Sequence, residues 1–212
     1  MKKIYIFSSL IVAVIISAVI LMSKLPSLEV ARFVSPAKDL PKFQLQQNDK
    51  PFNNQSLKNK WSIMFFGYAR CPDVCPTELM FLNNISENIK IKMPDVYFVS
   101  VDASRDTPDM LNKFTAYFNK NFIGIGGKQT ESDKLSSFMN VIYERVYHKD
   151  GKQVIIKKNA TVPDELKDSY LINHSADIYL INPEGKLHAV FPLPHKLDSF
   201  ISDITRVVNN YK

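Results

Sequence analysis

The chain has 212 residues and a formal net charge of +6, with 45% hydrophobic and 23% charged residues. These proportions are those of a globular protein and exclude disorder along the whole chain. Its two cysteines exclude a disulfide-dense scaffold, a four-cysteine zinc site and a cysteine-held iron–sulfur cluster. The basic excess alone does not distinguish a nucleic-acid partner from a membrane surface or from neither.

Residues 4–22 form an uncharged, largely apolar segment, which is long enough to span the hydrocarbon core of a bilayer. Lys2 and Lys3 precede it, so the positive-inside rule places the N-terminus in the cytoplasm. A cleavable signal peptide is the alternative, but its apolar stretch is usually shorter and ends at a small-residue cleavage site. We therefore expect residues 1–24 to anchor a single-pass protein in a bacterial inner (cytoplasmic) membrane, with the C-terminal domain facing the periplasm.

Residues 25–40, which contain Pro26 and Pro36, are predicted to be a tether. From residue 41 to residue 212, apolar runs alternate with helical patterns, which predicts one folded domain. This domain carries 22 basic and 19 acidic residues, and no basic helix interleaved with aromatics is present. We therefore expect no nucleic-acid partner.

The first half of this domain is predicted to alternate strands and helices. The continuous apolar run at 63–66 predicts a buried strand, and apolar residues from Leu79 to Ile89 recur at helical spacing. A second strand is expected at 96–101. Thr107 and Pro108 are suited to open a helix. The core face of that helix is predicted to be Met110, Leu111, Phe114, Tyr117 and Phe118.

The second half continues with a short strand at 122–125 and a helix whose apolar face ends at Ile142. The polar segment 143–170 is expected to hold one edge strand. Strands at 177–182 and 186–191 flank a turn, which predicts a hairpin, and a final amphipathic helix follows. This order predicts an α/β fold with a mixed central sheet.

Cys71 and Cys75 lie between the first buried strand and the first helix. Ligand sites of α/β folds occur at such junctions, and a spacing of four places both sulfurs on one side of a helical turn. A helix N-terminus favours the thiolate, which is both a metal ligand and a nucleophile. A structural disulfide or two buried thiols remain the alternatives.

A metal needs more ligands than two thiolates, and thiolate with imidazole selects copper or zinc. Of the four histidines, His174 is favoured because it lies just before the hairpin and is flanked by two polar residues, Asn173 and Ser175. His188 is expected to be an ordinary strand residue, His195 a cap or surface residue, and His148 a solvated turn residue.

Three segments of the sequence resemble the SCO/SenC family of copper proteins. They are FFGYARCPDVCPTEL, SVDASRDTPDML and LINHSADIYLINPEGKL, and the resemblance runs from about Phe43 to the C-terminus. It implies a thioredoxin-like fold that binds one copper ion, as Cu(I) or Cu(II), through Cys71, Cys75 and His174. It also implies a copper chaperone that assembles the dinuclear copper centre of cytochrome c oxidase subunit II or serves another copper-site protein.

The resemblance leaves a second activity open, because some members of the family are regarded as thiol–disulfide reductases of the oxidase copper site. Cys71 and Cys75 would then be catalytic, and His174 would be dispensable. A redox or copper sensor using the same residues is a third possibility, and peroxidase activity is a weaker one. Whether the protein is an enzyme is therefore open at this stage.

Two details of the motifs carry further expectations. Many family members have Asp immediately before the histidine, and Asn173 in its place is expected to orient the imidazole less well. Arg105 is expected to pair with Asp102 or Asp106 in a loop. Such exposed pairs contribute little to stability, although this one lies at the sheet end that carries the cysteines.

Overall fold

The computed structural model describes residues 28, 30–157 and 160–211. The expected membrane anchor at 1–24 lies outside these residues. In the part of the chain that is described, no helix is both long and apolar enough to cross a bilayer.

A mixed β-sheet forms the centre of the fold, as the sequence predicts. Parallel pairing joins β4 to β5 and β5 to β6, whereas β10, β11 and β1 are added antiparallel on the other side of β4. In spatial order, the strands are β1 (Arg32–Asp39), β11 (Lys186–Phe191), β10 (Ile178–Ile181), β4 (Ser62–Gly67), β5 (Asp95–Ser100) and β6 (Ile123–Ile125).

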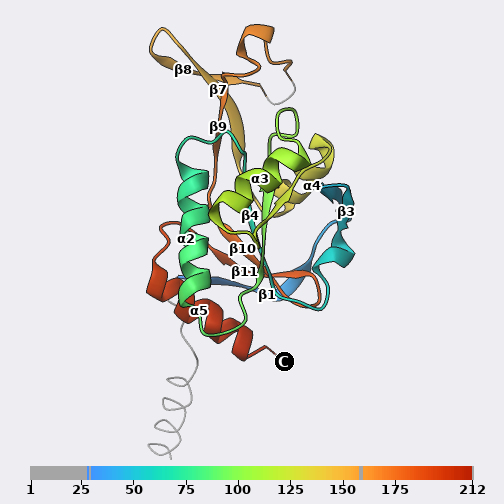
Figure 1. Cartoon of the computed structure of the whole chain (residues 1–212), viewed down its shortest axis with the longest axis vertical. Helices are drawn as coiled ribbons and strands as arrows, with labels where there is room; N and C mark the ends of the chain where they lie inside the picture. The colour runs from blue at the N-terminus through green and yellow to red at the C-terminus, as the bar shows by residue number, and fades with distance from the viewer. Residues whose placement is uncertain (1–27, 29, 158–159, 212) are drawn as a thin grey trace, which may run out of the picture.

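Helices cover this sheet, and α2 packs against both α3 and α5 (Figure 1). The helices are α2 (Val74–Asn88), α3 (Pro108–Phe118), α4 (Gln129–Phe138) and α5 (Leu197–Asn209). All six residues of β4 are buried, which its continuous apolar sequence predicts for a central strand. The segment that carries Cys71 and Cys75 follows this strand directly, so a fully buried strand fixes its position.

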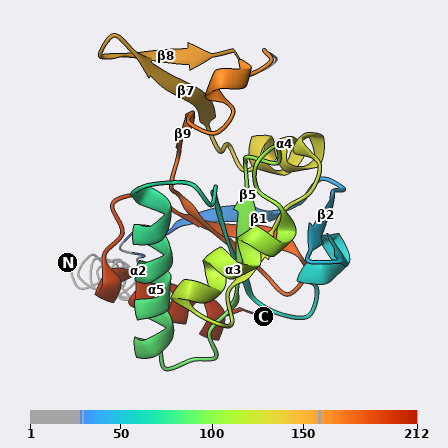
Figure 2. The same cartoon turned by 45° about the horizontal axis from the view of Figure 1, so that its top comes forward.

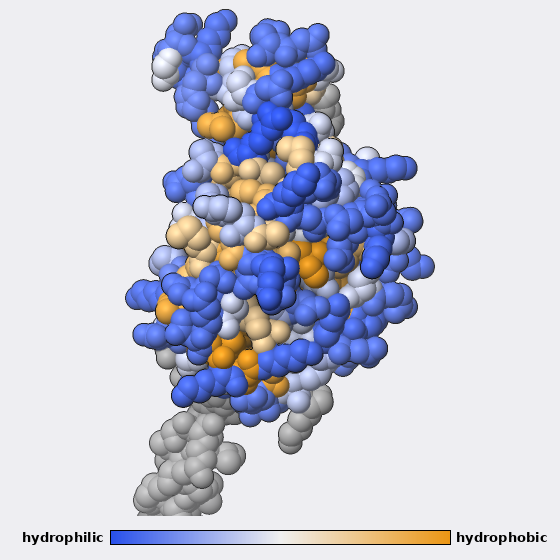
Figure 3. All heavy atoms as spheres, viewed as in Figure 1, coloured by the Kyte–Doolittle hydropathy of each residue, from blue (hydrophilic) through white to orange (hydrophobic). Residues whose placement is uncertain are grey.

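Two smaller sheets complete the structure. The hairpin of β2 (Gln44–Gln47) and β3 (Lys50–Asn53) is followed by a 3-10 turn, η1 (Asn54–Leu57). The other sheet has the order β8 (Lys152–Ile156), β7 (Tyr143–Lys149) and β9 (Leu171–His174), with a second 3-10 turn, η2 (Asp164–Leu166), before β9. This sheet projects beyond the central one (Figures 1 and 2), and its outer end is largely hydrophilic on the face shown in Figure 3.

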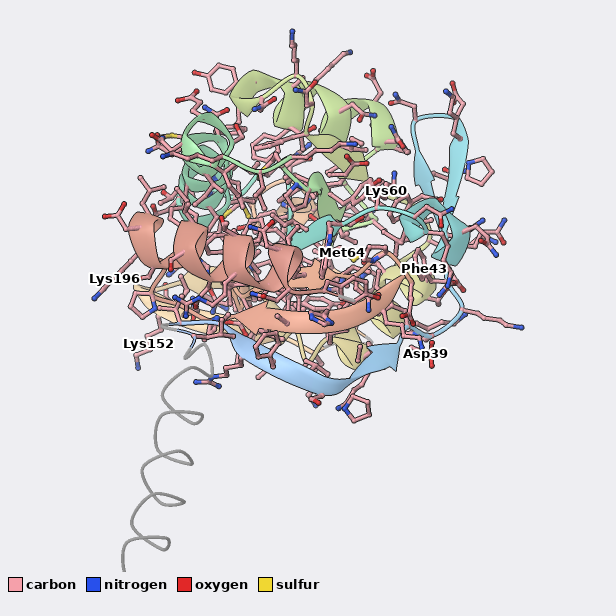
Figure 4. All side chains as sticks on the ribbon, turned by 90° about the horizontal axis from the view of Figure 1, so that it is seen from below. Asp39, Phe43, Lys60, Met64, Lys152 and Lys196 are labelled. Carbon is pink, nitrogen blue, oxygen red and sulfur yellow. The ribbon has the colours of Figure 1, made fainter. Side chains whose placement is uncertain are left out.

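The boundary expected between tether and domain is wrong for residues 32–39. These residues form β1, which pairs with β11 at the edge of the sheet (Figure 4). Pro36 lies where the pairing register shifts between Phe33 and Lys38, and an edge strand tolerates a proline at such an irregularity. Just before β1, the buried carboxylate of Asp203 accepts hydrogen bonds from the backbone N–H groups of residues 30 and 31.

The helix after β5 opens as predicted, because Thr107 Oγ1 accepts a hydrogen bond from Met110 N and Pro108 is in the first turn. Its predicted core face is wrong in part. Leu111 is fully buried, but the Tyr117 side chain is 84% exposed. The buried stripe runs through Leu111 and Thr115, and it is narrower than the apolar pattern of the sequence.

Candidate metal centre

The loop from β4 to α2 brings Cys71 and Cys75 together. Cys71 N donates to the Tyr68 carbonyl at 3.2 Å, which turns the chain after the strand. Cys75 lies in the first turn of α2, and its N–H donates to Cys71 Sγ at 3.4 Å. Cys71 Sγ therefore accepts a hydrogen bond from the first turn of α2, where the helix N-terminus stabilises negative charge on sulfur.

Gly67, the last residue of β4, makes room for the buried thiol of Cys75. A Cβ atom at this position would lie 2.5 Å from Cys75 Sγ and 2.7 Å from the Phe98 ring. Real Cβ atoms do not approach other atoms this closely, so any larger residue would displace the sulfur or the ring. No motif in the sequence marks Gly67 as part of the site, although a glycine at the end of a buried strand indicates a close approach.

His174 ends β9 and points its Nε2 atom at Cys75 Sγ, at a distance of 3.2 Å. Its Nδ1 atom lies 3.0 Å from the Ser175 carbonyl oxygen. A carbonyl oxygen can only accept, so Nδ1 is the donor of this hydrogen bond, and Nε2 is the ring nitrogen that faces the sulfurs. This is the arrangement by which proteins usually orient a metal-binding histidine.

Ser175 is itself fixed to the start of β7. Its N–H donates to the Ile142 carbonyl at 2.8 Å, and its Oγ accepts from Ile142 N at 3.2 Å. Asn173 is exposed, and its amide donates to Gln153 Oε1. The Asn173 side chain therefore does not orient the imidazole, which agrees with the weaker orienting role expected of Asn at this position. Neighbouring strand residues point to opposite faces, and the Ser175 carbonyl orients the ring instead.

The structure thus brings together all three residues that the sequence singled out as metal ligands. Among the described residues, the candidate metal-binding group is Cys71, Cys75 and His174, whose ligand atoms all lie within 4.8 Å of one another. Both cysteines are free thiols. Two soft sulfur donors and one imidazole nitrogen form a donor set that selects copper, particularly Cu(I), or zinc.

The two thiols have different protonation behaviour. The hydrogen bond with Cys75 lowers the pKa of Cys71 to about 3, against the opposing effect of partial burial, and His174 adds to this lowering. Burial raises the pKa of Cys75 well above its usual range. The hydrogen bond between the two sulfurs therefore favours negative charge on Cys71 and keeps the proton on Cys75. A metal that binds both sulfurs must release the Cys75 proton, so acid opposes binding.

The other histidines lie outside this group. His148 is an exposed residue of β7 instead of a turn residue, and His188 is a strand residue of β11 as expected. The expectation of a cap or surface role for His195 is wrong, because its side chain is 2% exposed. Its Nδ1 and Nε2 atoms lie 2.7 Å from Glu78 Oε2 and 2.9 Å from the Phe191 carbonyl.

The ion pair of the second motif also differs from its expectation. Arg105 Nε donates to Asp102 Oδ2 at 2.5 Å, and the two side chains are only 6% and 2% exposed. The pair is buried because Arg105 stacks on the Tyr170 ring, with 3.4 Å between the guanidinium carbon and the ring centroid. The sequence could not indicate this burial, since Tyr170 lies 65 residues away.

Fold and site together define a thioredoxin-like α/β protein with a metal centre of two cysteines and one histidine. The sequence model of the SCO1/SenC family matches residues 35–209. The chain belongs to the SCO1/SenC family.

Individual relatives agree with this membership. The chain is 31% identical over 191 residues to a SCO2-like protein of Rickettsia typhi, with 87% of each chain covered. It resembles the structure of Bradyrhizobium japonicum ScoI with copper bound, at 30% identity and a TM-score of 0.62, covering 79% of this chain and 98% of that one. The copper-bound ScoI of Arabidopsis thaliana gives 28% identity and a TM-score of 0.65, covering 81% of this chain and 98% of that one.

Proposed function

We propose that this protein binds one copper ion through Cys71, Cys75 and His174 and delivers it to a copper-site protein. The observation that carries this proposal is the convergence of two sulfurs and one imidazole nitrogen within 4.8 Å at the start of α2. The copper-bound structures of the two ScoI relatives support copper as the ion. The partner that we propose is cytochrome c oxidase subunit II, whose dinuclear copper centre would receive the ion.

The geometry suits a carrier that gives up its cargo. Cys71 lies in a loop and is partly exposed, whereas Cys75 is fully buried. Incoming ligands of a partner can reach copper from the side of Cys71 and replace the donors one at a time. Two thiolates favour Cu(I), and the imidazole also permits Cu(II), so the site can hold either oxidation state.

For the location of the protein, we propose a bacterial inner membrane. The uncharged segment 4–22 would span the bilayer, with Lys2 and Lys3 on the cytoplasmic side and the copper-binding domain in the periplasm. Protease treatment of spheroplasts tests this orientation. The proposed orientation predicts that the C-terminal domain is digested in intact spheroplasts. Full protection of the domain would overturn this orientation.

Copper delivery is tested by complementation of a deletion strain. We expect wild-type protein to restore oxidase activity and subunit II copper, and the His174→Ala variant to restore neither. The His148→Ala variant is the matched control, because His148 is exposed and lies outside the metal centre. Normal subunit II copper in the His174→Ala strain, at wild-type protein levels, would contradict copper delivery through this site.

A second candidate function is reduction of a disulfide in the oxidase copper site. The observation in its favour is a partly exposed thiol, Cys71, beside a buried thiol, Cys75, which is the arrangement of an attacking and a resolving cysteine. This activity requires both cysteines but not His174. Oxidase assembly that is lost in Cys71→Ala and Cys75→Ala strains but kept in the His174→Ala strain would favour it over copper delivery.

A further inference from the structure

Tyr68 connects the cysteine loop to the histidine strand through two separate bonds. Its carbonyl accepts from Cys71 N at 3.2 Å, and its hydroxyl accepts from Ile172 N at 3.1 Å. Ile172 lies two residues before His174 on β9. The ring of Tyr68 is buried and meets the His174 ring edge-on, with 6.0 Å between the centroids. One residue thus contacts both halves of the metal centre.

Arg105 supports the connection between Tyr68 and β9, because its guanidinium contacts the rings of both Tyr68 and Tyr170. Its guanidinium carbon lies 3.4 Å from the centroid of the Tyr170 ring and 5.8 Å from that of the Tyr68 ring. Its Nη1 donates to the Tyr170 carbonyl at 2.8 Å, while Asp102 accepts from both Arg105 and the Tyr170 hydroxyl. The start of β9 is therefore held to the loop that follows β5.

These contacts matter because the strand of His174 belongs to the projecting sheet and not to the central one. In the described part of the chain, β9 pairs only with β7, and the outer part of this sheet projects beyond the central one (Figure 2), whereas Ile172 is part of the hydrophobic core. Strand pairing alone therefore does not tie β9 to the loop that carries the cysteines. The bond of Tyr68 to Ile172 N and that of Arg105 to the Tyr170 carbonyl join β9 directly to the core.

We propose that Tyr68 is a positioning residue that holds His174 at ligand distance from Cys71 and Cys75 through its hydrogen bond to Ile172 N, with Arg105 supporting it. The proposal rests on the copper site proposed above and adds a residue that acts through His174. If Tyr68 only filled space, its ring would be sufficient and its hydroxyl would be dispensable. Removing the hydroxyl alone therefore separates positioning from packing.

The test is a double-mutant cycle of Tyr68→Phe and His174→Ala in the purified full-length chain. Copper affinity is measured by competition for Cu(I) with a chromophoric chelator. We expect Tyr68→Phe to weaken binding about tenfold, which is typical for a residue that orients a metal ligand. In the His174→Ala background, the same change should have no further effect, because the ligand that Tyr68 positions is gone.

Tyr97→Phe is the matched control. Tyr97 is also a buried tyrosine, but its hydroxyl accepts from Lys60 Nζ at 2.8 Å, away from the metal centre. The Tyr97→Phe variant should leave copper affinity unchanged. An unchanged affinity in Tyr68→Phe, or an equal loss with and without His174, would overturn the positioning role.

Hydrogen exchange of the metal-free protein supplies a readout that does not depend on copper. We expect Tyr68→Phe to accelerate exchange of the Ile172 amide, while amides of β4 and β5 keep their protection. Unchanged exchange at Ile172 would overturn the proposal. Wild-type protein that binds no copper would instead overturn the proposed function, whatever the exchange experiment gives, so the two failures are distinguishable.

Discussion

Cys75 Sγ and His174 Nε2 lie 3.2 Å apart, although 99 residues separate them in the chain. Cys75 is placed by the start of α2, and His174 is placed by the end of the projecting strand β9. The metal centre therefore exists only when the central sheet and the projecting sheet are both folded. Metal binding and folding are coupled in such a site.

Replacing Gly67 by alanine should damage the metal centre directly. The added methyl group would lie 2.5 Å from Cys75 Sγ and 2.7 Å from the Phe98 ring, so the sulfur cannot keep its place without a shift of the surrounding structure. We expect copper affinity to fall about tenfold or more, and stability to fall by about 1–3 kcal/mol. Chelator competition and urea denaturation measure the two effects.

Gly151→Ala is the control for this substitution. No atom lies within 4 Å of a Cβ at Gly151, but its φ of +72° strains an alanine there. This variant should lose roughly 1 kcal/mol of stability and keep wild-type copper affinity. If Gly67→Ala bound copper as tightly as Gly151→Ala, the close contact with Cys75 would not matter for the site.

The two thiols should react with iodoacetamide in a fixed order. Cys71 is partly exposed, whereas Cys75 is fully buried. Because alkylation needs access to the sulfur, the first label on the native, metal-free protein should be on Cys71, as located by peptide mass spectrometry. Equal labelling of both cysteines before unfolding would contradict the burial of Cys75.

Removing the charge of Arg105 should lower the free energy of unfolding far more than removing the charge of an exposed lysine. Arg105→Met leaves Asp102 buried without its cation, and breaking a buried pair costs about 3–5 kcal/mol. Lys113→Met breaks an exposed pair with Asp109 and should cost less than about 1 kcal/mol. Similar urea midpoints for the two variants would contradict a structural role for the buried pair.

The pair of His195 and Glu78 should make stability depend on pH. Burial by itself lowers the pKa of His195, but the hydrogen bonds to Glu78 and to the Phe191 carbonyl outweigh it and raise this pKa overall. A raised pKa means that the folded state holds the proton more tightly than the unfolded state. The stability that protonated His195 contributes is therefore complete below its unfolded-state pKa of about 6.5. This stability is lost as the pH rises through the pKa of His195 in the folded protein.

Urea denaturation of His195→Gln at pH 5.5 and pH 8.5 checks this sign. The variant should lose roughly 2 kcal/mol at the lower pH, where the charged hydrogen bonds are present, and less at the higher pH. His148→Gln, at an exposed position, should behave as wild type at both values. A loss that grows with rising pH would show that the assigned direction is wrong.

Patterns that are local in the sequence predicted the fold well. The continuous apolar run of β4, the capping residues Thr107 and Pro108, and the turn before β11 each encode their structure within a few residues. The sequence of β1 predicts part of a tether, because a proline such as Pro36 is typical of a break. Its role depends on pairing with β11, which no neighbouring residue indicates.

For the metal centre, residue chemistry and family resemblance named the ligands but not the residues that hold them in place. The hydroxyl of Tyr68 bonds to Ile172 N, 104 residues away, and His174 is oriented by a main-chain carbonyl. Carbonyls are present at every residue, so no side-chain pattern marks this one. Burial of Arg105 and His195 likewise depends on partners that are distant in the chain.

Copper titration of the full-length chain and of three single variants tests the central claim most directly. The wild type should bind one Cu(I) ion per chain. Cys71→Ala, Cys75→Ala and His174→Ala should each weaken or abolish binding, while His148→Ala should bind as the wild type does. Undiminished one-to-one binding in all three ligand variants would contradict the assignment of the site.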